Sequence, residues 1–498
     1  MSQYPGLFCC RRRPGVLGSG MAALVEGPYL SCMRLATLAA PCAGMLLAGS
    51  AVLADAQDWT TFGWDVSRSS APGVSTGLAP DTVGALTRQQ VVIDGTVDGS
   101  AIYLRGVSIH GAAHDAFFVT TTYGKTLAID ADRGTVLWEF TPPGYGALAG
   151  TYRITNSTPV ADADRASIYA ASPDGVIRKL SVQDGSVAWA TAITRLPERE
   201  KIASPLTFYR GRVIAATDGY IGDRPPYQGH VAVLDAASGS LLRVWNSLSS
   251  DRHVLLDPAS VPESDSGIWG RAGVVVDPAS GDLFVATGNG RWDGSVNWGD
   301  AVIELDPDAA GILGNYTPMN TDQLDAEDAD LGSTSPVLLG GGLVAQGGKD
   351  RMIRVLDWAA MRGTSPHRGG ESSHVSTPSG ARLFTAPAVL HSAGTTWLYA
   401  ADAGATEAWT LSGRTLVTRW KVEHGGTSPV ASGGMLFVYD PQGAIRIYEA
   451  TTGREIAALP CGPGHWNSPI VADGRIALPE GNANAHRQDG VLDIWRLQ

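Results

Sequence analysis

A short pattern of small, acidic, glycine and tryptophan residues recurs along this chain and constrains its fold more than any other feature. The clearest copy is Ala128-Ile-Asp-Ala-Asp-Arg-Gly-Thr-Val-Leu-Trp138. A second copy covers residues 179–189, and a third covers 233–245, where the Trp comes two places late. A fourth, at 447–457, has Ala in the Trp position. Such self-similarity indicates a repeated structural unit.

A second repeat runs in phase with the first and fixes the number of units. It is a small residue followed by Pro and a short apolar segment, and two segments in the same phase lack the Pro, at 109–112 and 269–274. This makes eight units spaced by about forty to fifty residues, widening to about sixty-five around the third and fourth, and about forty residues is the length of one four-stranded propeller blade. The copies with Pro are Thr158-Pro159, Ser204-Pro205, Ser335-Pro336, Ala386-Pro387, Ser428-Pro429 and Ser468-Pro469.

Within each unit, short alternating apolar segments are separated by Asp- and Gly-containing turns, as in 167–180. Period-two alternation between such turns is the pattern of β-strands. Asp caps the turn with its side chain and Gly supplies a positive φ, so the Trp that follows can pack on the next blade. We therefore predict an all-β fold, a single eight-bladed β-propeller of four-stranded antiparallel blades, with structural Trp residues.

The ends of the repeat region predict how the ring closes. The eighth unit, 468–497, has three predicted strands, and the segment 86–93 is a further strand with no partner nearby in sequence. We expect this N-terminal strand to complete the last blade, which removes two free sheet edges. The propeller would then span 86–498, residues 55–85 would lie over the outside of the ring, and 362–382 would form an exposed loop.

The first 54 residues have the features of a targeting segment. A basic residue and a short apolar run lead to small residues before Ala54, which indicates a signal peptide cleaved near Ala54. Residues 1–32 resemble an over-long gene start, with Met33 as the initiator. The apolar run is shorter than the roughly twenty residues that span a bilayer, so we expect no stable membrane anchor. The protein is then expected to be periplasmic or secreted.

Charge and cysteine content exclude some classes of function. The formal net charge is −12; residues 1–54 carry four Arg and one Glu, so the remainder has −12 − 3 = −15. An acidic protein binds nucleic acid poorly, so we expect no nucleic-acid partner. Four of the five cysteines precede residue 55, which leaves Cys461 and no structural disulfide.

The Ala-x-Asp-x-x-x-Gly-x-x-x-Trp pattern of 128–138 resembles the tryptophan-docking motif of the quinoprotein alcohol dehydrogenase family. Members are eight-bladed propellers, and many bind pyrroloquinoline quinone (PQQ) and Ca²⁺ at the ring centre. The resemblance implies an enzyme that oxidises an alcohol or sugar by hydride transfer to PQQ and passes electrons to an external acceptor. The superfamily also contains ligand-free scaffolds.

Three positions match site motifs of that family. Trp269, in Trp-Gly-Arg-Ala-Gly-Val, resembles the Trp that forms the floor under the quinone, where a flat ring suits a flat cofactor. Asn289, in Thr-Gly-Asn-Gly-Arg-Trp, resembles the residue that gives calcium an amide oxygen. Lys349 resembles the basic residue that contacts the quinone oxygens. A core Trp and two turn residues would be the plain structural alternatives.

Two other family positions are altered. The catalytic Asp of the family follows a Thr-Pro step, but here Asn320 occupies that place, and a two-residue insertion is needed to make Asp322 the catalytic base. Asp322 otherwise belongs to a solvated acidic loop. The calcium-binding Glu is replaced by Arg224, which leaves Asp223 as the nearest carboxylate metal ligand.

Two functions follow from these residues. We favour a PQQ-dependent dehydrogenase with a small alcohol or sugar as substrate, because Trp269, Asn289 and Lys349 lie in different units yet match one site. The alternative is a non-catalytic periplasmic propeller that presents its loops to a protein or polysaccharide.

Overall fold

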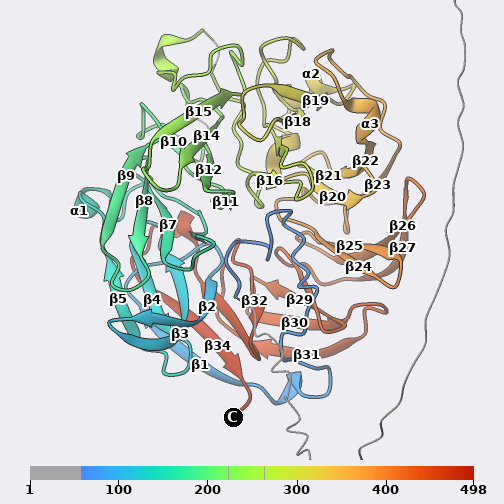
Figure 1. The fold of residues 1–498 in the computed structure, drawn as a ribbon. Coiled ribbons are helices and arrows are strands. Elements are labelled where there is room, and N and C mark those ends of the chain that lie inside the picture. Colours follow the sequence, from blue (N-terminus) through green and yellow to red (C-terminus); the bar gives the residue numbers. More distant parts are fainter. Residues whose placement is uncertain (1–57, 223, 263) are drawn as a thin grey trace, which may run out of the picture. The chain divides into compact units, whose positions relative to one another are not determined.

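Eight four-stranded antiparallel sheets follow one another around a ring (Figure 1). The computed structural model describes residues 58–222, 224–262 and 264–498. The predicted signal peptide, with Met33 and Ala54, lies outside these ranges, as does Asp223. The predicted all-β, eight-bladed propeller is confirmed.

Blades 1 to 4 take their strands in chain order, with the first strand at one edge of each sheet and the last at the other. Their strands are, for blade 1, β2 (Ile102–Ile109), β3 (Ala112–Thr120), β4 (Thr126–Asp130) and β5 (Val136–Phe140); for blade 2, β6 (Val160–Ala161), β7 (Ser167–Ser172), β8 (Val176–Ser181) and β9 (Val187–Ala192); for blade 3, β11 (Thr207–Tyr209), β12 (Arg212–Ala216), β14 (His230–Asp235) and β15 (Leu241–Asn246); for blade 4, β16 (Val275–Val276), β17 (Leu283–Ala286), β18 (Val302–Leu305) and β19 (Ile312–Tyr316).

Blades 5 to 8 repeat this order, except that the last blade borrows a strand from the N-terminal part of the chain. Their strands are, for blade 5, β20 (Val337–Gly340), β21 (Leu343–Gln346), β22 (Met352–Asp357) and β23 (Ser373–Ser376); for blade 6, β24 (Ala388–Ser392), β25 (Thr395–Ala401), β26 (Thr406–Ser412) and β27 (Thr415–Val422); for blade 7, β28 (Val430–Ser432), β29 (Met435–Asp440), β30 (Ala444–Glu449) and β31 (Glu455–Pro460); for blade 8, β32 (Ile470–Ala472), β33 (Arg475–Glu480), β34 (Gly490–Arg496) and β1 (Thr87–Ile93).

Elements outside the blades are short. A two-stranded ribbon, β10 (Glu200–Lys201) with β13 (Asp218–Gly219), joins two loops of blade 3. None of the helices within the described ranges is long and apolar enough to cross a membrane. The helical segments are η1 (Val83–Ala85), α1 (Tyr145–Leu148), η2 (Pro258–Ser260), α2 (Thr321–Ala326), η3 (Leu331–Ser333), α3 (Trp358–Met361) and η4 (Ala483–Ala485).

The repeated motif forms the turn that it predicts. In blade 1 the carboxylate of Asp130 accepts hydrogen bonds from the backbone N–H groups of Asp132 and Arg133, and Gly134 has a φ of 67°. The Trp that follows joins neighbouring blades, because its indole N–H donates to a backbone carbonyl of the next blade. These bonds run from Trp138 to Val182, from Trp189 to Ala236 and from Trp420 to Ala450, at 2.8, 3.1 and 2.9 Å.

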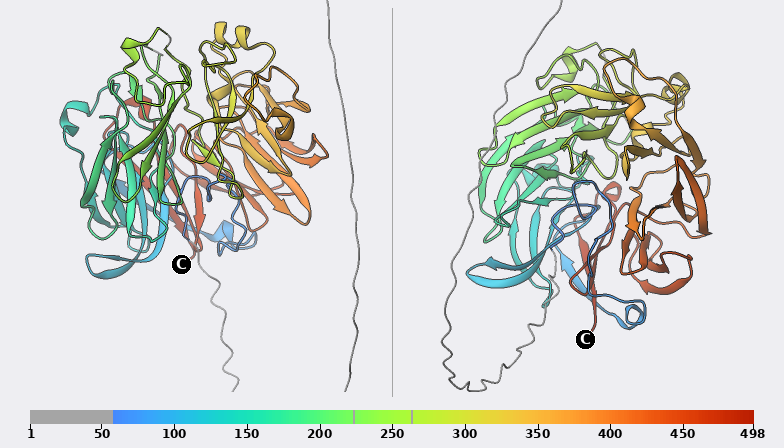
Figure 2. Two further views of the ribbon diagram at one scale, coloured as in Figure 1. Left: turned by 45° about the horizontal axis from the view of Figure 1, so that its top comes forward. Right: turned by 45° about the vertical axis from the view of Figure 1, so that its right-hand side comes forward.

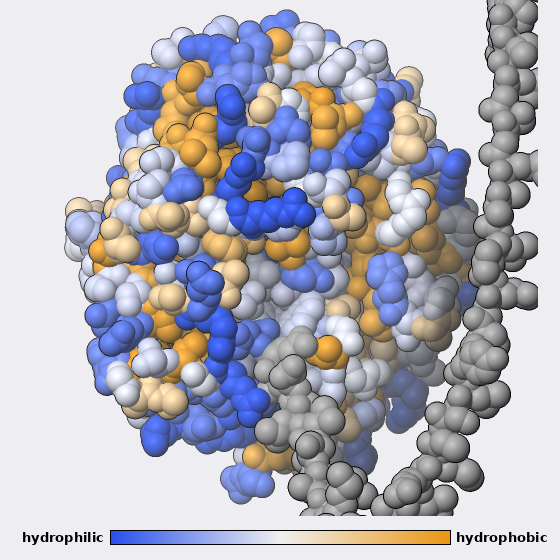
Figure 3. Space-filling model, in the orientation of Figure 1, coloured by the Kyte–Doolittle hydropathy of each residue, from blue (hydrophilic) through white to orange (hydrophobic). Residues whose placement is uncertain are grey.

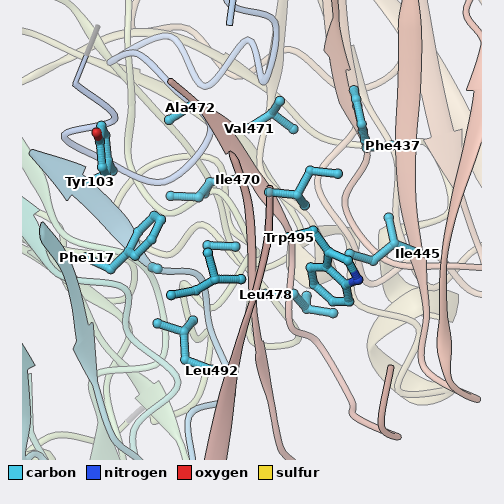
Figure 4. Close-up of a cluster of buried hydrophobic side chains, with 14 of the residues drawn as sticks. Tyr103, Phe117, Phe437, Ile445, Ile470, Val471, Ala472, Leu478, Leu492 and Trp495 are labelled. Carbon is cyan, nitrogen blue, oxygen red and sulfur yellow. The ribbon is translucent and has the colours of Figure 1, made fainter. Parts of the chain in front are cut away.

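Ring closure is as predicted. Strand β1 pairs antiparallel with β34 over its whole length, from Thr87 opposite Arg496 to Ile93 opposite Gly490. Figure 4 shows the buried side chains of blade 8, Leu478 among them, between those of blades 1 and 7. The pairing of β1 with β34 satisfies an edge that would otherwise be free, and the burial of this continuous apolar layer stabilises the closed ring.

Two expectations about segments next to the blades were wrong. Residues 362–382 are not an uninterrupted loop, because they contain β23, the fourth strand of blade 5.

Residues 58–77 do not lie over the outside of the ring, where we expected them. The first strands of adjacent blades contact one another, as β24 and β28 do, so the first strand of each blade is the innermost one. The N-terminal segment is hydrogen-bonded to several of these innermost strands (Figure 2).

The physical reason is that each innermost strand has one edge without a partner strand. Carbonyl groups of the N-terminal segment accept hydrogen bonds from several of these edges, including the N–H groups of Val276, Val389 and Ala431. The buried guanidinium of Arg68 donates to the Leu206 carbonyl and to the Thr207 hydroxyl of blade 3. The segment thus connects the inner strands of different blades.

Candidate functional site

The loops that lead into the innermost strands bring three large rings together. Trp269, Phe384 and Trp466 precede the first strands of blades 4, 6 and 8, and their ring centroids lie 6.0–6.2 Å apart. Blades 4 and 8 lie on opposite sides of an eight-bladed ring, so rings from both can meet only near its axis. The aromatic cluster therefore marks the centre of the propeller on this face.

Above the aromatic cluster is a cavity of about 420 Å³, within the usual size range of small-molecule sites. Its lining combines aromatic rings, three basic side chains and several carboxylate and amide groups. The basic residues are Lys201, Lys349 and Arg382, the acidic residues Asp218, Asp265 and Asp330, and the amides Asn289 and Asn484. Figure 3 shows polar and apolar residues intermingled over one side of the molecule, rather than one continuous apolar patch.

Three of the residues singled out in the sequence share this cavity. Trp269 reaches it from the loop before blade 4, Asn289 from the loop after β17 and Lys349 from the loop after β21. The Lys349 Nζ atom lies 5.4 Å from the centroid of the Trp269 ring. Residues separated by eighty positions in the chain therefore line one cavity.

A carboxylate that the sequence motif did not single out lies between them. Asp330 accepts a hydrogen bond of 2.7 Å from the backbone N–H of Asn289 and forms an ion pair with Lys349. Lys349 also pairs with Asp328, at 2.7 Å. Burial alone would lower the pKa of Lys349, but these two carboxylates raise that pKa above its ordinary value. Lys349 is therefore held as an ammonium ion beside the Trp269 ring.

The structure does not bring Asp322 to this cavity. Asp322 lies in the first turn of α2, its side chain is 83% exposed, and it forms an ion pair of 3.1 Å with Arg368. The reason is local, since residues 321–326 form a surface helix and the chain returns to the axis only at Asp330. The D-x-x-D spacing therefore selected a surface residue. Asp223, the other carboxylate named from the sequence, lies outside the described residues.

A polar cluster beside the aromatic rings carried no motif in the sequence. Buried Asp98 accepts hydrogen bonds from His465 Nδ1, at 2.8 Å, and from the backbone N–H of Trp466. Although burial opposes ionisation, the hydrogen bond and charge of His465 and the charge of Arg271 hold the pKa of Asp98 below its ordinary value. Arg271 donates to the backbone carbonyls of Asp98 and Trp466 across the ring. This cluster fixes the loops that carry the aromatic rings.

PQQ is a flat ortho-quinone with three carboxylate groups, and the residues present fit it. The Trp269 indole offers a flat surface, and three basic side chains in the lining match three carboxylates. The Asn289 Oδ1 atom is buried and has no hydrogen-bond partner within the described part of the chain. Such an atom is costly unless a ligand satisfies it.

Calcium fits the described residues poorly. Ca²⁺ takes six to eight oxygen ligands, whereas Asn289 Oδ1 is one such atom and the Asp330 oxygens are engaged by Lys349 and a backbone N–H. Across residues 58–222, 224–262 and 264–498, no cluster of three or more His, Cys, Asp or Glu side chains could hold a metal ion. The positive charge beside Asp330 is supplied by the Lys349 ammonium.

Comparison with known proteins agrees with this architecture. Residues 104–253 match the family model described as outer membrane protein assembly factor BamB. A polyvinylalcohol dehydrogenase of Sphingopyxis sp. (strain 113P3) is 22% identical over 212 residues, which are 40% of this chain and 31% of that protein. The dehydrogenase subunit of the quinone alcohol dehydrogenase of Acetobacter aceti is 22% identical over 239 residues, 42% of this chain and 32% of that protein. The matches thus span about a third of each relative.

Among solved structures, the quinohemoprotein alcohol dehydrogenase from Comamonas testosteroni superposes with a TM-score of 0.66 at 16% identity. The superposition covers 88% of this chain and 80% of that chain. These likenesses confirm, at the level of repeat and fold, the resemblance of this chain to the quinoprotein alcohol dehydrogenase-like (PQQ-type) β-propellers.

Proposed function

We propose that the protein binds PQQ in the central cavity and oxidises an alcohol or a sugar by hydride transfer to it. The observation that carries this proposal is the convergence of Trp269, Asn289 and Lys349 on one cavity at the ring centre. A fold alone does not identify a function, but three site residues from separate loops in one cavity support a specific ligand.

Each cavity residue has a role in this proposal. Trp269 supports the flat face of the cofactor, and Lys349 and Arg382 pair with its oxygens and carboxylates. Bound PQQ would supply an electrophilic carbonyl that accepts the hydride. Asp330 replaces Asp322 as the group that accepts the hydroxyl proton of the substrate, because Asp330 lines the cavity and Asp322 does not.

The substrate class and the location follow from the names of the relatives and from the sequence. The names of the two curated relatives include an alcohol dehydrogenase and a polyvinylalcohol dehydrogenase, which favours an alcohol. The chain has no Cys-x-x-Cys-His haem motif, so electrons would pass to an external acceptor. Export to the periplasm follows from the signal-peptide features of residues 1–54.

Titration of the purified protein with PQQ tests this proposal. We expect saturable quenching of tryptophan fluorescence and a shift of the PQQ absorbance, unchanged by Ca²⁺ or EDTA because Lys349 provides the charge. Trp269→Ala should weaken binding by at least about tenfold, the equivalent of about 1.4 kcal/mol, whereas Trp397→Ala, a half-buried Trp that stacks on Tyr399 of blade 6 and does not line the cavity, should not. Loaded protein should reduce a dye with members of an alcohol and sugar panel. A flat absorbance titration would exclude the dehydrogenase.

The outward position of Asp322 keeps a second function open. A non-catalytic propeller would present its loops to a protein or polysaccharide, and the description of the matched family, outer membrane protein assembly factor BamB, favours a protein partner. Absence of PQQ binding, together with a stable partner recovered after cross-linking in envelope extracts, would favour this scaffold.

A further inference from the structure

A second lysine lines the central cavity, in an environment unlike that of Lys349. Lys201 lies in β10, opposite Asp218 of β13 in the two-stranded ribbon of blade 3. Its side chain is 5% exposed, and it lines the cavity together with Trp269 and Trp466. Within the described residues it makes no ion pair closer than 4 Å, whereas Lys349 makes two. The two cavity lysines therefore differ in how firmly their charge is held.

The surroundings of Lys201 make its ammonium group easier to deprotonate than that of an ordinary lysine. Burial lowers the pKa of Lys201 to about 8, and the positive charge of nearby Arg271 acts in the same direction, against the carboxylates of Asp218 and Asp98. The same cavity raises the pKa of Lys349. A pair of like groups whose pKa values are pushed apart by their environments commonly has two separate chemical roles.

We propose that Lys201 is a nucleophilic amine that captures a carbonyl compound in the central cavity as an imine. A buried primary amine whose pKa is lowered by desolvation or by a neighbouring cation can act in this way. The proposal needs an electrophilic carbonyl close to the aromatic cluster. Two sources share this chemistry, namely a quinone and an aldehyde such as the product of alcohol oxidation. The inference goes beyond the dehydrogenase and does not depend on it.

The reaction balances without any oxidant or reductant. The nitrogen lone pair of Lys201 forms the new C–N bond, the carbonyl π electrons move to oxygen, and a proton passes from nitrogen to that oxygen to give a carbinolamine. Loss of the hydroxyl group with a second proton, as water, leaves the C=N double bond. Asp218, opposite Lys201 in the ribbon, is placed to accept and return the proton. Hydrolysis reverses each step.

Reductive trapping tests this inference directly, because the chain has only five lysines, Lys125, Lys179, Lys201, Lys349 and Lys421. One arm incubates the protein with benzaldehyde and cyanoborohydride and the other with PQQ and cyanoborohydride, each followed by intact mass and peptide mapping. At pH 7 an amine of pKa about 8 is neutral roughly two hundred times more often than an ordinary lysine. Among the lysines we therefore expect the adduct at Lys201, formed at least about tenfold faster than at Lys179 or Lys421, and peptide mapping separates it from labelling of the α-amino group, whose ordinary pKa is also about 8.

The adduct should vanish in Lys201→Arg and in Lys201→Met and persist in Lys421→Arg, which changes an exposed lysine. Circular dichroism identifies a variant that has not folded, and the Met variant then serves in place of the Arg variant. The labelling rate should rise with pH to a midpoint near 8. Equal labelling of all five lysines, or undiminished labelling in the Lys201 variants, would overturn the inference. PQQ binding by absorbance with no adduct in either arm would overturn it and leave the dehydrogenase proposal intact.

Discussion

The indole of Trp138 in blade 1 lies directly against Gly185 in blade 2. A Cβ atom at Gly185 would come 2.7 Å from Cε3 of Trp138, and Gly185 has a φ of 70°. The same contact recurs between Trp189 and Gly239. The motif therefore places a glycine at this turn for two reasons, since only glycine adopts the backbone conformation freely and leaves room for the ring of the previous blade.

Replacement of Gly185 by Ala should lower the free energy of unfolding by about 2–4 kcal/mol. Strain at positive φ contributes about 1 kcal/mol, and overpacking against Trp138 adds about 1–3 kcal/mol. Urea unfolding measures the change. Gly211→Ala is the matched control, because Gly211 has a φ of 76° but open space around its Cβ position, so it should lose about 1 kcal/mol. Equal losses in both variants would mean that the indole contact does not require glycine.

Removal of the Asp330 carboxylate should disturb the cavity, whereas removal of the Asp322 carboxylate should not. Asp330→Asn removes the closest counter-ion of the buried Lys349 ammonium but leaves the half-exposed Asp328 beside it, so the loss should lie near the lower end of the about 3–5 kcal/mol that a broken buried pair costs. Asp322→Asn changes a surface side chain, which usually alters stability by less than about 0.5 kcal/mol. Thermal unfolding and PQQ titration of both variants measure the difference.

A double variant separates loss of the pair from loss of the residue. Asp330→Asn combined with Lys349→Met removes both charges and should recover most of the lost stability, because no buried charge is left unpaired and Asp328, which loses Lys349, is half exposed. It should still fail to turn over substrate. Normal turnover in Asp330→Asn, or its loss in Asp322→Asn, would contradict the assignment of the base to Asp330.

The structural features predicted correctly from the sequence are those that residues close together in the chain determine. A turn built from Asp130 and Gly134 needs only neighbouring backbone groups, so its recurrence indicated the repeated blade, and the Pro step in phase with it gave the number of blades. Trp269 and Lys349 were found because each begins a short motif on a fixed loop. Asp330 was missed because a surface helix separates it from the Thr-Pro step, so its position depends on an insertion. Lys201 was missed because an isolated lysine has no spacing signal.

Placement of the N-terminal segment failed for a similar reason. Residues 58–77 carry no strand periodicity, and their hydrogen-bond partners belong to inner strands that are far away in sequence. The free edges of those strands exist only after the ring has closed. A segment whose carbonyl groups accept hydrogen bonds from strand edges formed only in the folded ring cannot be recognised from its own sequence pattern.

Arg68 tests the importance of that segment. Its guanidinium is fully buried and donates to the Phe62 carbonyl at 2.7 Å, to the Leu206 carbonyl at 3.0 Å and to the hydroxyls of Thr61 and Thr207. Arg68→Ala should destabilise the protein by about 2–4 kcal/mol, because buried acceptors lose a charged donor. Thermal unfolding measures the loss, and Arg243→Ala, at an exposed position of β15, should change stability by less than about 0.5 kcal/mol. Equal losses of stability in the Arg68 and Arg243 variants would mean that the N-terminal segment contributes little to the stability of the folded protein.

The buried carboxyl of Glu200 should make stability depend on pH. Glu200 is 1% exposed and accepts hydrogen bonds from the Thr194 hydroxyl and from the Gln228 N–H. Burial raises the pKa of Glu200 to about 7, against the effect of these hydrogen bonds. The folded protein therefore binds more protons than the unfolded chain between about pH 4.5 and 7, so this group lowers stability as the pH rises through that window.

Glu200→Gln should remove this contribution, because the amide stays neutral and keeps an oxygen acceptor of the same shape. The variant should match the wild type near pH 4.5 and exceed its free energy of unfolding by up to about 3 kcal/mol at pH 8, since each pKa unit corresponds to about 1.36 kcal/mol. Urea unfolding at both pH values measures the difference. Glu198→Gln, on the exposed loop before β10, should show no such pH-dependent gain. A gain at pH 8 no larger than at pH 4.5 would mean that the folded protein does not hold this proton.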